Sequence, residues 1–159
     1  KSLERYKKSH GSIPDSLWED TKMGTVGCGV LDKNGNLAAG TSTGGMTGKR
    51  YGRIGDSPII GAGTYANNQT CAISCTGHGE YFIRYNVAAD VSARMAYSGV
   101  GLQEAAQTVI QKVLRDAKGD GGLIGVDKEG NITMEFNTTG MFRAYVKEGE
   151  EAVVEMFGD

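Results

Sequence analysis

A chain of 159 residues is long enough to bury one sizeable core and too short for two domains of ordinary size. Hydrophobic residues make up 39% and charged residues 23%, which is a globular composition and argues against disorder. The formal net charge of −2 leaves no basic excess, so composition argues against nucleic acid and an anionic membrane surface as partners.

The chain begins with a polar segment, which a hairpin follows. Residues 1–24 are rich in Lys, Ser, Asp and Glu and have no sustained hydrophobic period, which predicts a flexible, solvated linker. The segment Thr25–Asp32 is apolar and β-branched, Lys33–Asn36 is a turn sequence, and Leu37–Thr43 predicts a second strand. We therefore expect a linker followed by one domain, residues 25–159.

The middle of the chain predicts a loop, a strand and two helices. Residues 44–58 form a glycine-rich, charged loop, and Cys71–Thr76 predicts a third strand. Apolar residues then recur with helical spacing over Ile83–Met95 and Leu102–Val113, with a separation near Ser98 and Gly99. The pattern indicates two adjacent amphipathic helices.

Further strands are expected after the glycine cluster Gly119–Gly122. They are Leu123–Val126, Ile132–Phe136, Phe142–Val146 and Ala152–Phe157. The order of strands, helices and strands predicts the α+β class, with sheet packed on sheet and helices on an outer face. Because the first and last strands are apolar on both faces, we expect something outside this chain to cover one face.

The three cysteines, Cys28, Cys71 and Cys75, are an odd number and have no metal-ligand spacing. This argues against a disulfide framework and against a zinc site. Free thiols favour a reducing compartment, the cytoplasm.

The motifs of the common hydrolases are absent. The sequence has no GxSxG, HExxH or P-loop motif and only two histidines, so a hydrolase here needs another base. An N-terminal threonine brings its own base, because a free α-amine titrates near ~8. The junction of Gly24 and Thr25 fits such a site once cleaved, although a threonine that opens a strand is more often only structural.

Several motifs together resemble the plant-type asparaginase and isoaspartyl peptidase family of N-terminal-nucleophile hydrolases. The resemblance extends in matching order over nearly everything from Thr25 to Phe157 and implies that family's αββα four-layer sandwich, with this chain supplying the catalytic half. The segments are GTVGCGVLD (24–32), GTSTGGMT (40–47), GRIGDSP (52–58), GAGTYANN (61–68), SCTGHGE (74–80) and FNTTGMFRA (136–144).

By matching position, the resemblance assigns a catalytic group. Thr25 would become the nucleophile after autocatalytic cleavage of the bond between Gly24 and Thr25. Thr43 would orient the Thr25 amine, and the Thr76 hydroxyl with the Gly77 amide would form the oxyanion hole.

The resemblance also assigns a substrate-binding group. Arg53 would hold the substrate α-carboxylate, while Asp56 and the Gly79 carbonyl would bind the α-ammonium. Such a group selects a substrate with a free α-ammonium and α-carboxylate. The scissile bond would therefore be the side-chain amide of L-asparagine or the β-peptide bond of an isoaspartyl dipeptide. Taken alone, Arg53 and Asp56 would more often form an exposed loop salt bridge without a function.

Two alternative functions stay open. One is glycosylasparaginase, a branch of the same family that uses the same nucleophile. The other is a non-catalytic, unprocessed fragment, because residues 1–24 precede the nucleophile and resemble the end of the family's alpha subunit, which is otherwise missing.

The resemblance implies partners as well. They are the alpha subunit of the same precursor, an (αβ)₂ assembly and a small-molecule substrate. It implies no catalytic metal or other cofactor, with room for a structural sodium ion in the alpha subunit. An export signal in the missing part would place the protein in the periplasm instead of the cytoplasm.

Overall fold

The computed structural model describes residues 24–46 and 48–158 of the chain. The predicted linker, residues 1–24, lies outside the described residues except for Gly24, which immediately precedes the first strand.

The described residues form strands and helices in the predicted order. The strands are β1 (Thr25–Leu31), β2 (Leu37–Thr43), β3 (Thr64–Ala66), β4 (Cys71–Gly77), β5 (Gly121–Asp127), β6 (Ile132–Phe136), β7 (Gly140–Tyr145) and β8 (Val153–Phe157). The helical segments are α2 (Gly79–Tyr85), α3 (Val87–Ala93), η2 (Arg94–Ser98), α4 (Leu102–Thr108) and η3 (Val109–Leu114), of which η2 and η3 are π-helical turns.

The hairpin of β1 and β2 is fixed by its turn. The Asp32 carboxylate accepts hydrogen bonds from the Asn34 and Asn36 amides, both at 2.8 Å, and from the Asn36 side chain at 3.0 Å. Gly35 has φ +82°, a conformation that glycine adopts without strain. The turn sets an antiparallel register in which Thr25 lies opposite Thr43.

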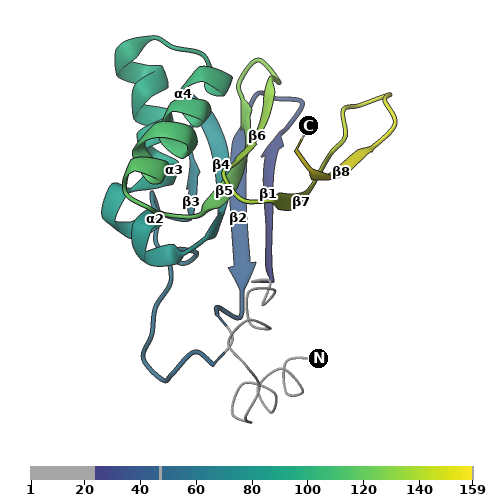
Figure 1. Ribbon diagram of the computed structural model, residues 1–159. Helices are drawn as coiled ribbons and strands as arrows, with labels where there is room; N and C mark the ends of the chain where they lie inside the picture. Colours follow the sequence, from purple (N-terminus) through teal and green to yellow (C-terminus); the bar gives the residue numbers. More distant parts are fainter. Residues whose placement is uncertain (1–23, 47, 159) are drawn as a thin grey trace.

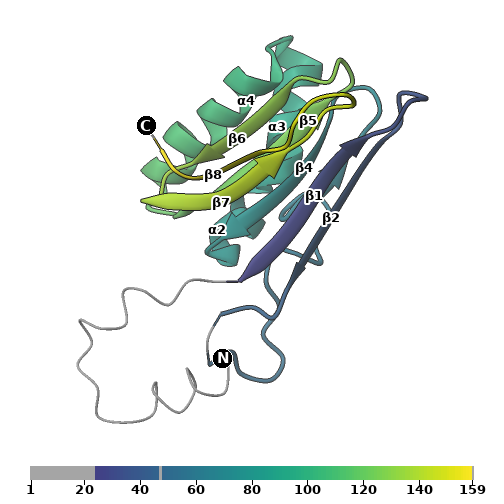
Figure 2. The ribbon, with the colours of Figure 1, turned by 90° about the vertical axis from the view of Figure 1, so that its right-hand side faces the viewer.

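The molecule is layered. Strands β3, β4, β5 and β6 form an antiparallel sheet in that order. Helices α2, α3 and α4 cover one face of this sheet, and the pairs β1–β2 and β7–β8 lie over the other (Figure 1; Figure 2). The α+β class and the packing of sheet on sheet are therefore confirmed.

The core lies between the helices and the four-stranded sheet. Phe82, Val91 and Ile110 from the helical layer pack against Ile73 of β4 and Leu123 of β5, and all five are fully buried. Each such side chain contributes about 1.5–3 kcal/mol when removed from water. This core holds β4, whose end carries two of the predicted site residues.

Two local predictions were wrong. The expected helix over Ile83–Met95 is interrupted at Asn86, which has φ +49° and separates α2 from α3. Asparagine is among the few non-glycine residues that tolerate this left-handed conformation. The helical spacing of apolar residues therefore continues past Asn86, although the helix itself is interrupted there. The short strand β3 was also missed, because three residues carry no readable period.

Within the described ranges, no helix combines the length and apolar character needed to cross a membrane.

Candidate active site

Thr25 and Thr43 face each other at the open end of the first hairpin. The Thr43 hydroxyl donates a hydrogen bond to the Gly24 carbonyl oxygen, 3.1 Å away, and accepts one from the Gly45 amide at 3.0 Å. The Thr43 hydroxyl therefore polarises the carbonyl that precedes Thr25. The predicted contact with a free Thr25 amine concerns the cleaved chain and stays a prediction.

Strand β1 packs directly over β4. A Cβ atom at Gly27 would collide with the Ser74 side chain, and one at Gly29 would lie 3.2 Å from the Ala72 carbonyl oxygen. Since β1 advances by two residues as β4 retreats by two, the next step of this register lies between Thr25 and Thr76. Packing of the two layers thus brings the start of β1, which carries the proposed nucleophile, over the end of β4, which carries the proposed oxyanion hydroxyl.

Hydrogen bonds also join the layer of β1 and β2 to the four-stranded sheet. The Thr41 hydroxyl donates to the Gly63 carbonyl oxygen at 3.1 Å, and the Thr41 and Ser74 hydroxyl oxygens are 2.6 Å apart. Because Thr41 uses its proton on Gly63, Ser74 donates to Thr41. The contact between Thr41 and Ser74 fixes β2 against β4 two residues before Thr43.

The backbone after Thr76 is held by a close contact between two glycines of neighbouring strands. Gly77 pairs with Gly121 and has φ +151°, and a Cβ atom on it would collide with the Asp120 carbonyl oxygen and the Gly121 Cα. The His78 amide donates to the same Asp120 carbonyl at 3.0 Å. The close approach explains why glycine is required at Gly77.

Asp56 is a buried carboxylate, 6% exposed. Its Oδ2 atom has no hydrogen-bond partner among the described residues. Gly79 packs against it so closely that a Cβ atom there would lie 2.6 Å from Asp56 Oδ1. Burial raises the pKa of Asp56 above 3.8, opposed by its own backbone amide and by the charge of Arg53. A buried carboxylate with an open oxygen can bind a cation.

Arg53 supplies the positive charge beside Asp56. Its guanidinium packs against the loop, because a Cβ atom added at Gly45 or Gly55 would touch Nη1. The Nη2 atom lies 4.0 Å from a carboxylate oxygen of Glu80. The charge of Glu80 in turn raises the pKa of Asp56. No role in the site was predicted for Glu80 from the sequence, although it lies within the motif SCTGHGE, directly after Gly79.

The structure brings the predicted site residues to one end of the molecule. Gly45 contacts both Thr43 and Arg53, and Gly79, against Asp56, lies two residues beyond Gly77. Figure 1 shows the start of β1, the end of β2 and the start of α2 at the same end. The two predicted groups, catalytic and substrate-binding, are therefore neighbours.

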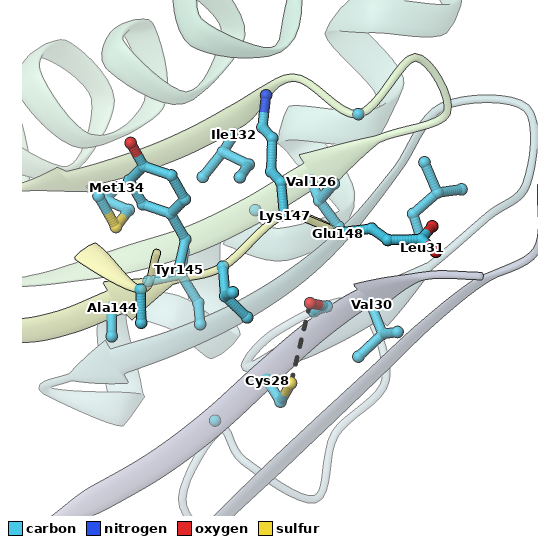
Figure 3. Close-up of a pocket in the computed structure, with 17 residues that line it drawn as sticks. Cys28, Val30, Leu31, Val126, Ile132, Met134, Ala144, Tyr145, Lys147 and Glu148 are labelled. Carbon is cyan, nitrogen blue, oxygen red and sulfur yellow. Dashed lines mark hydrogen bonds between the residues drawn. The ribbon is translucent and has the colours of Figure 1, made fainter. Parts of the chain in front are cut away.

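A separate groove of about 550 Å³ lies away from these residues and runs beside β1. Figure 3 shows its lining, contributed by β1, by β5 and β6, and by the chain from β7 onward. We call it the β1–β7 groove. It is lined by apolar side chains that include Leu31, Val126, Ile132, Met134 and Tyr145, together with Lys147 and Glu148.

Comparison with known proteins gives consistent matches. The model of a family described as asparaginase matches residues 2–155. The chain is 54% identical to an isoaspartyl peptidase of Escherichia coli (strain K12), over 89% of this chain and 43% of that protein. It is 54% identical to a probable isoaspartyl peptidase/L-asparaginase 2 of Arabidopsis thaliana, over 78% and 37% respectively.

A mammalian relative extends the match. The isoaspartyl peptidase/L-asparaginase of Mus musculus is 45% identical over 94% of this chain and 45% of that protein. The chain thus spans less than half the length of these three curated relatives.

Proposed function

The chain belongs to the asparaginase family, and on this premise we propose that it is the catalytic part of a self-cleaving amidohydrolase acting on β-aspartyl dipeptides and L-asparagine. The observation that carries the proposal is the hydrogen bond from the Thr43 hydroxyl to the Gly24 carbonyl, with Thr25 opposite Thr43. The names of the relatives favour this activity over glycosylasparaginase.

Activation begins at the bond between Gly24 and Thr25. The Thr25 hydroxyl oxygen attacks the Gly24 carbonyl carbon, and the Thr43 hydroxyl donates to the oxyanion that forms. Collapse breaks the carbon–nitrogen bond, the hydroxyl proton passes to the departing nitrogen, and an ester joins Gly24 to the Thr25 oxygen. Water hydrolyses this ester and leaves a free α-amine on Thr25.

The freed amine then serves as the base for Thr25. It accepts the proton of the Thr25 hydroxyl, whose oxygen attacks the side-chain carbonyl of the substrate. The oxyanion faces the Thr76 hydroxyl and the Gly77 amide, and the protonated amine gives its proton to the leaving ammonia or amino acid. Water hydrolyses the aspartyl ester and releases L-aspartate. All groups belong to the chain or the substrate, so the proposal includes no cofactor.

The charged groups beside the nucleophile define the substrate class. The open oxygen of Asp56 accepts the substrate α-ammonium together with the Gly79 carbonyl, and Arg53 binds the α-carboxylate. L-Asparagine and β-aspartyl dipeptides share this head group and differ only in what leaves the side-chain carbonyl. One site therefore accepts both.

The remainder of the protein completes the fold in this proposal. Outward-facing residues of the hairpins are apolar and exposed, for example Val26 at 72% and Val154 at 76%. Neither β1 nor β7 pairs with a second strand among the described residues, and the apolar β1–β7 groove lies between them. An alpha subunit from the same precursor would fill the groove and add the fourth layer of an αββα sandwich. Two such heterodimers would form the (αβ)₂ assembly.

The test uses the full-length protein, wild type beside Thr25→Ala and Thr25→Ser. Intact mass follows cleavage, and turnover is assayed with β-Asp-Leu, L-asparagine and glycosylated asparagine. We expect the wild type to split after Gly24 and hydrolyse the first two substrates, Thr25→Ala to do neither, and Thr25→Ser to retain some of both. Turnover by uncut Thr25→Ala at the wild-type rate would refute the proposal, and a preference for glycosylated asparagine would select the other branch.

A further inference from the structure

We infer that Asn137 is a positioning residue for the oxyanion-binding backbone at Thr76 and Gly77, an inference that rests on the proposed function. Asn137 follows β6 and contacts both ends of the turn between η3 and β5. Its Oδ1 accepts a hydrogen bond from the Gly121 amide, and its Nδ2 donates to the Gly119 carbonyl, both at 2.9 Å. Its own amide donates to the Gly121 carbonyl at 3.0 Å. Three hydrogen bonds from one residue thus fix the turn.

The turn in question supports the end of β4. Gly121 pairs with Gly77, and Cβ atoms on either residue would collide with backbone of the other strand. The Asp120 carbonyl, between the two glycines that Asn137 holds, accepts the His78 amide. Because no side chain separates Gly77 from Gly121, a displacement of the turn moves the Gly77 backbone directly.

An oxyanion hole is sensitive to displacements of this kind. Its donors must already point at the position where negative charge develops, and a misplaced donor weakens the transition state more than the bound substrate. The charged groups of the substrate-binding site, Arg53 and Asp56, lie on a different segment, where the Gly63 amide donates to the Asp56 backbone carbonyl at 3.1 Å. Loss of the Asn137 contacts should therefore lower kcat while KM changes little.

The chain offers a matched control in Asn131, at the opposite end of β5 and β6. Its Nδ2 donates to the Asp127 carboxylate at 2.8 Å and its amide to the same carboxylate at 2.9 Å. Asn131→Ala thus removes a side-chain hydrogen bond from a turn on the same two strands, far from Thr76. It should cost stability without changing kcat.

The experiment compares wild type, Asn137→Ala, Asn137→Asp and Asn131→Ala in the full-length protein. Turnover of β-Asp-Leu is expressed per cleaved chain, counted by intact mass, and thermal unfolding reports stability. We expect Asn137→Ala to lower kcat about 10- to 100-fold with KM within about twofold, and Asn131→Ala to keep the wild-type kcat. Asn137→Asp keeps the acceptor for Gly121 and loses the donor for Gly119, so its kcat should be intermediate.

The outcomes separate this inference from the proposed function. If the wild type hydrolyses β-Asp-Leu and Asn137→Ala matches Asn131→Ala in kcat, or raises KM alone, Asn137 is only structural and the proposed function stands. If the wild type hydrolyses neither β-Asp-Leu nor L-asparagine, the proposed function and this inference are both rejected.

Discussion

Asp56 carries a cost in stability that its proposed role explains. Burial raises the pKa of its carboxyl above 3.8, so the folded state holds the proton more tightly than the unfolded state. Its contribution to stability is fully present below pH 3.8 and is lost as the pH rises through the raised pKa. Above its raised pKa the Asp56 carboxyl is a buried charge that a substrate ammonium would neutralise.

We predict that Asp56→Asn is more stable than the wild type at pH 7 and has a much higher KM for β-Asp-Leu. The variant removes the buried charge, so its advantage should vanish below pH 3.8, where the wild-type carboxyl is also protonated. Thermal unfolding between pH 3 and 8 measures this. Asp32→Asn is the control of opposite sign, because hydrogen bonds from Asn36 lower the Asp32 pKa and its contribution is lost as the pH falls. A less stable Asp56→Asn at pH 7 would contradict the argument.

Thr43 donates a hydrogen bond to the carbonyl before the proposed nucleophile, so the rate of chain cleavage measures its proposed role directly. Thr43→Val removes the donor to Gly24 and should slow cleavage by about 10²- to 10³-fold, the usual cost of one oxyanion donor. Intact mass against time gives the rate. Thr41→Val is the matched control on the same face of β2, because it breaks contacts to Gly63 and Ser74 but not to Gly24. Equal cleavage rates in the two variants would remove Thr43 from the mechanism.

At the scale of elements, two hairpins use one turn design. The segments 32–36 (DKNGN) and 127–131 (DKEGN) place an aspartate, a glycine with φ near +80° and an asparagine at the same positions. The Asp127 carboxylate accepts hydrogen bonds from the Glu129 and Asn131 amides, both at 2.9 Å, as Asp32 does in its own turn. Local sequence therefore sets the register that places Thr25 opposite Thr43.

The layer packing of β1 depends on glycine at one position. Gly27→Ala would press a methyl group into Ser74 and should destabilise the protein by about 1–3 kcal/mol, with slower cleavage because Thr25 is displaced. Gly40→Ala, on the outer face of β2 with nothing within 4 Å of a Cβ atom, is the control and should change stability by no more than about 0.5 kcal/mol. Denaturant unfolding measures both, and equal losses would exclude close packing as the cause.

At the scale of the whole molecule, the three thiols differ in access. Cys71 and Cys75 are buried, and burial raises the pKa of Cys71 to about 11 and that of Cys75 also well above 9.0. Cys28 is exposed and, because side chains alternate along a strand, lies on the opposite face of β1 from Gly27 and Gly29, which pack over β4. In the proposed assembly this face is covered, so Cys28 reports whether the alpha subunit is in place.

We predict that a thiol reagent modifies Cys28 in the 159-residue chain but not in the complete native protein. Cys71 and Cys75 should stay unmodified in both, because their thiolates are scarce and shielded. Lys33→Cys, at the exposed tip of the first hairpin, checks that the reagent is active in each sample. Mass spectrometry of labelled peptides gives the result. Equal labelling of Cys28 in both samples would show that no further layer covers β1.

The sequence by itself determined the local parts of this protein and the family to which it belongs. Turn residues such as Asp32 and Gly35 act on neighbours in the chain, so both hairpins could be predicted, and helical spacing gave α4. The fold class followed from the order of these elements. Motif matches singled out the candidate site residues from Thr25 to Gly79.

Only the tertiary structure decided how these residues meet. The packing of β1 over β4, the burial of Asp56 and the contact of Gly77 with Gly121 all depend on contacts between segments far apart in the sequence. The contacts of Glu80 and Asn137, and the break at Asn86, could not be predicted from the sequence for the same reason. The spacing of apolar residues in the sequence indicates which face of an element a residue occupies. Its distance to a partner on another element depends on how the helices and sheets pack together in the folded protein.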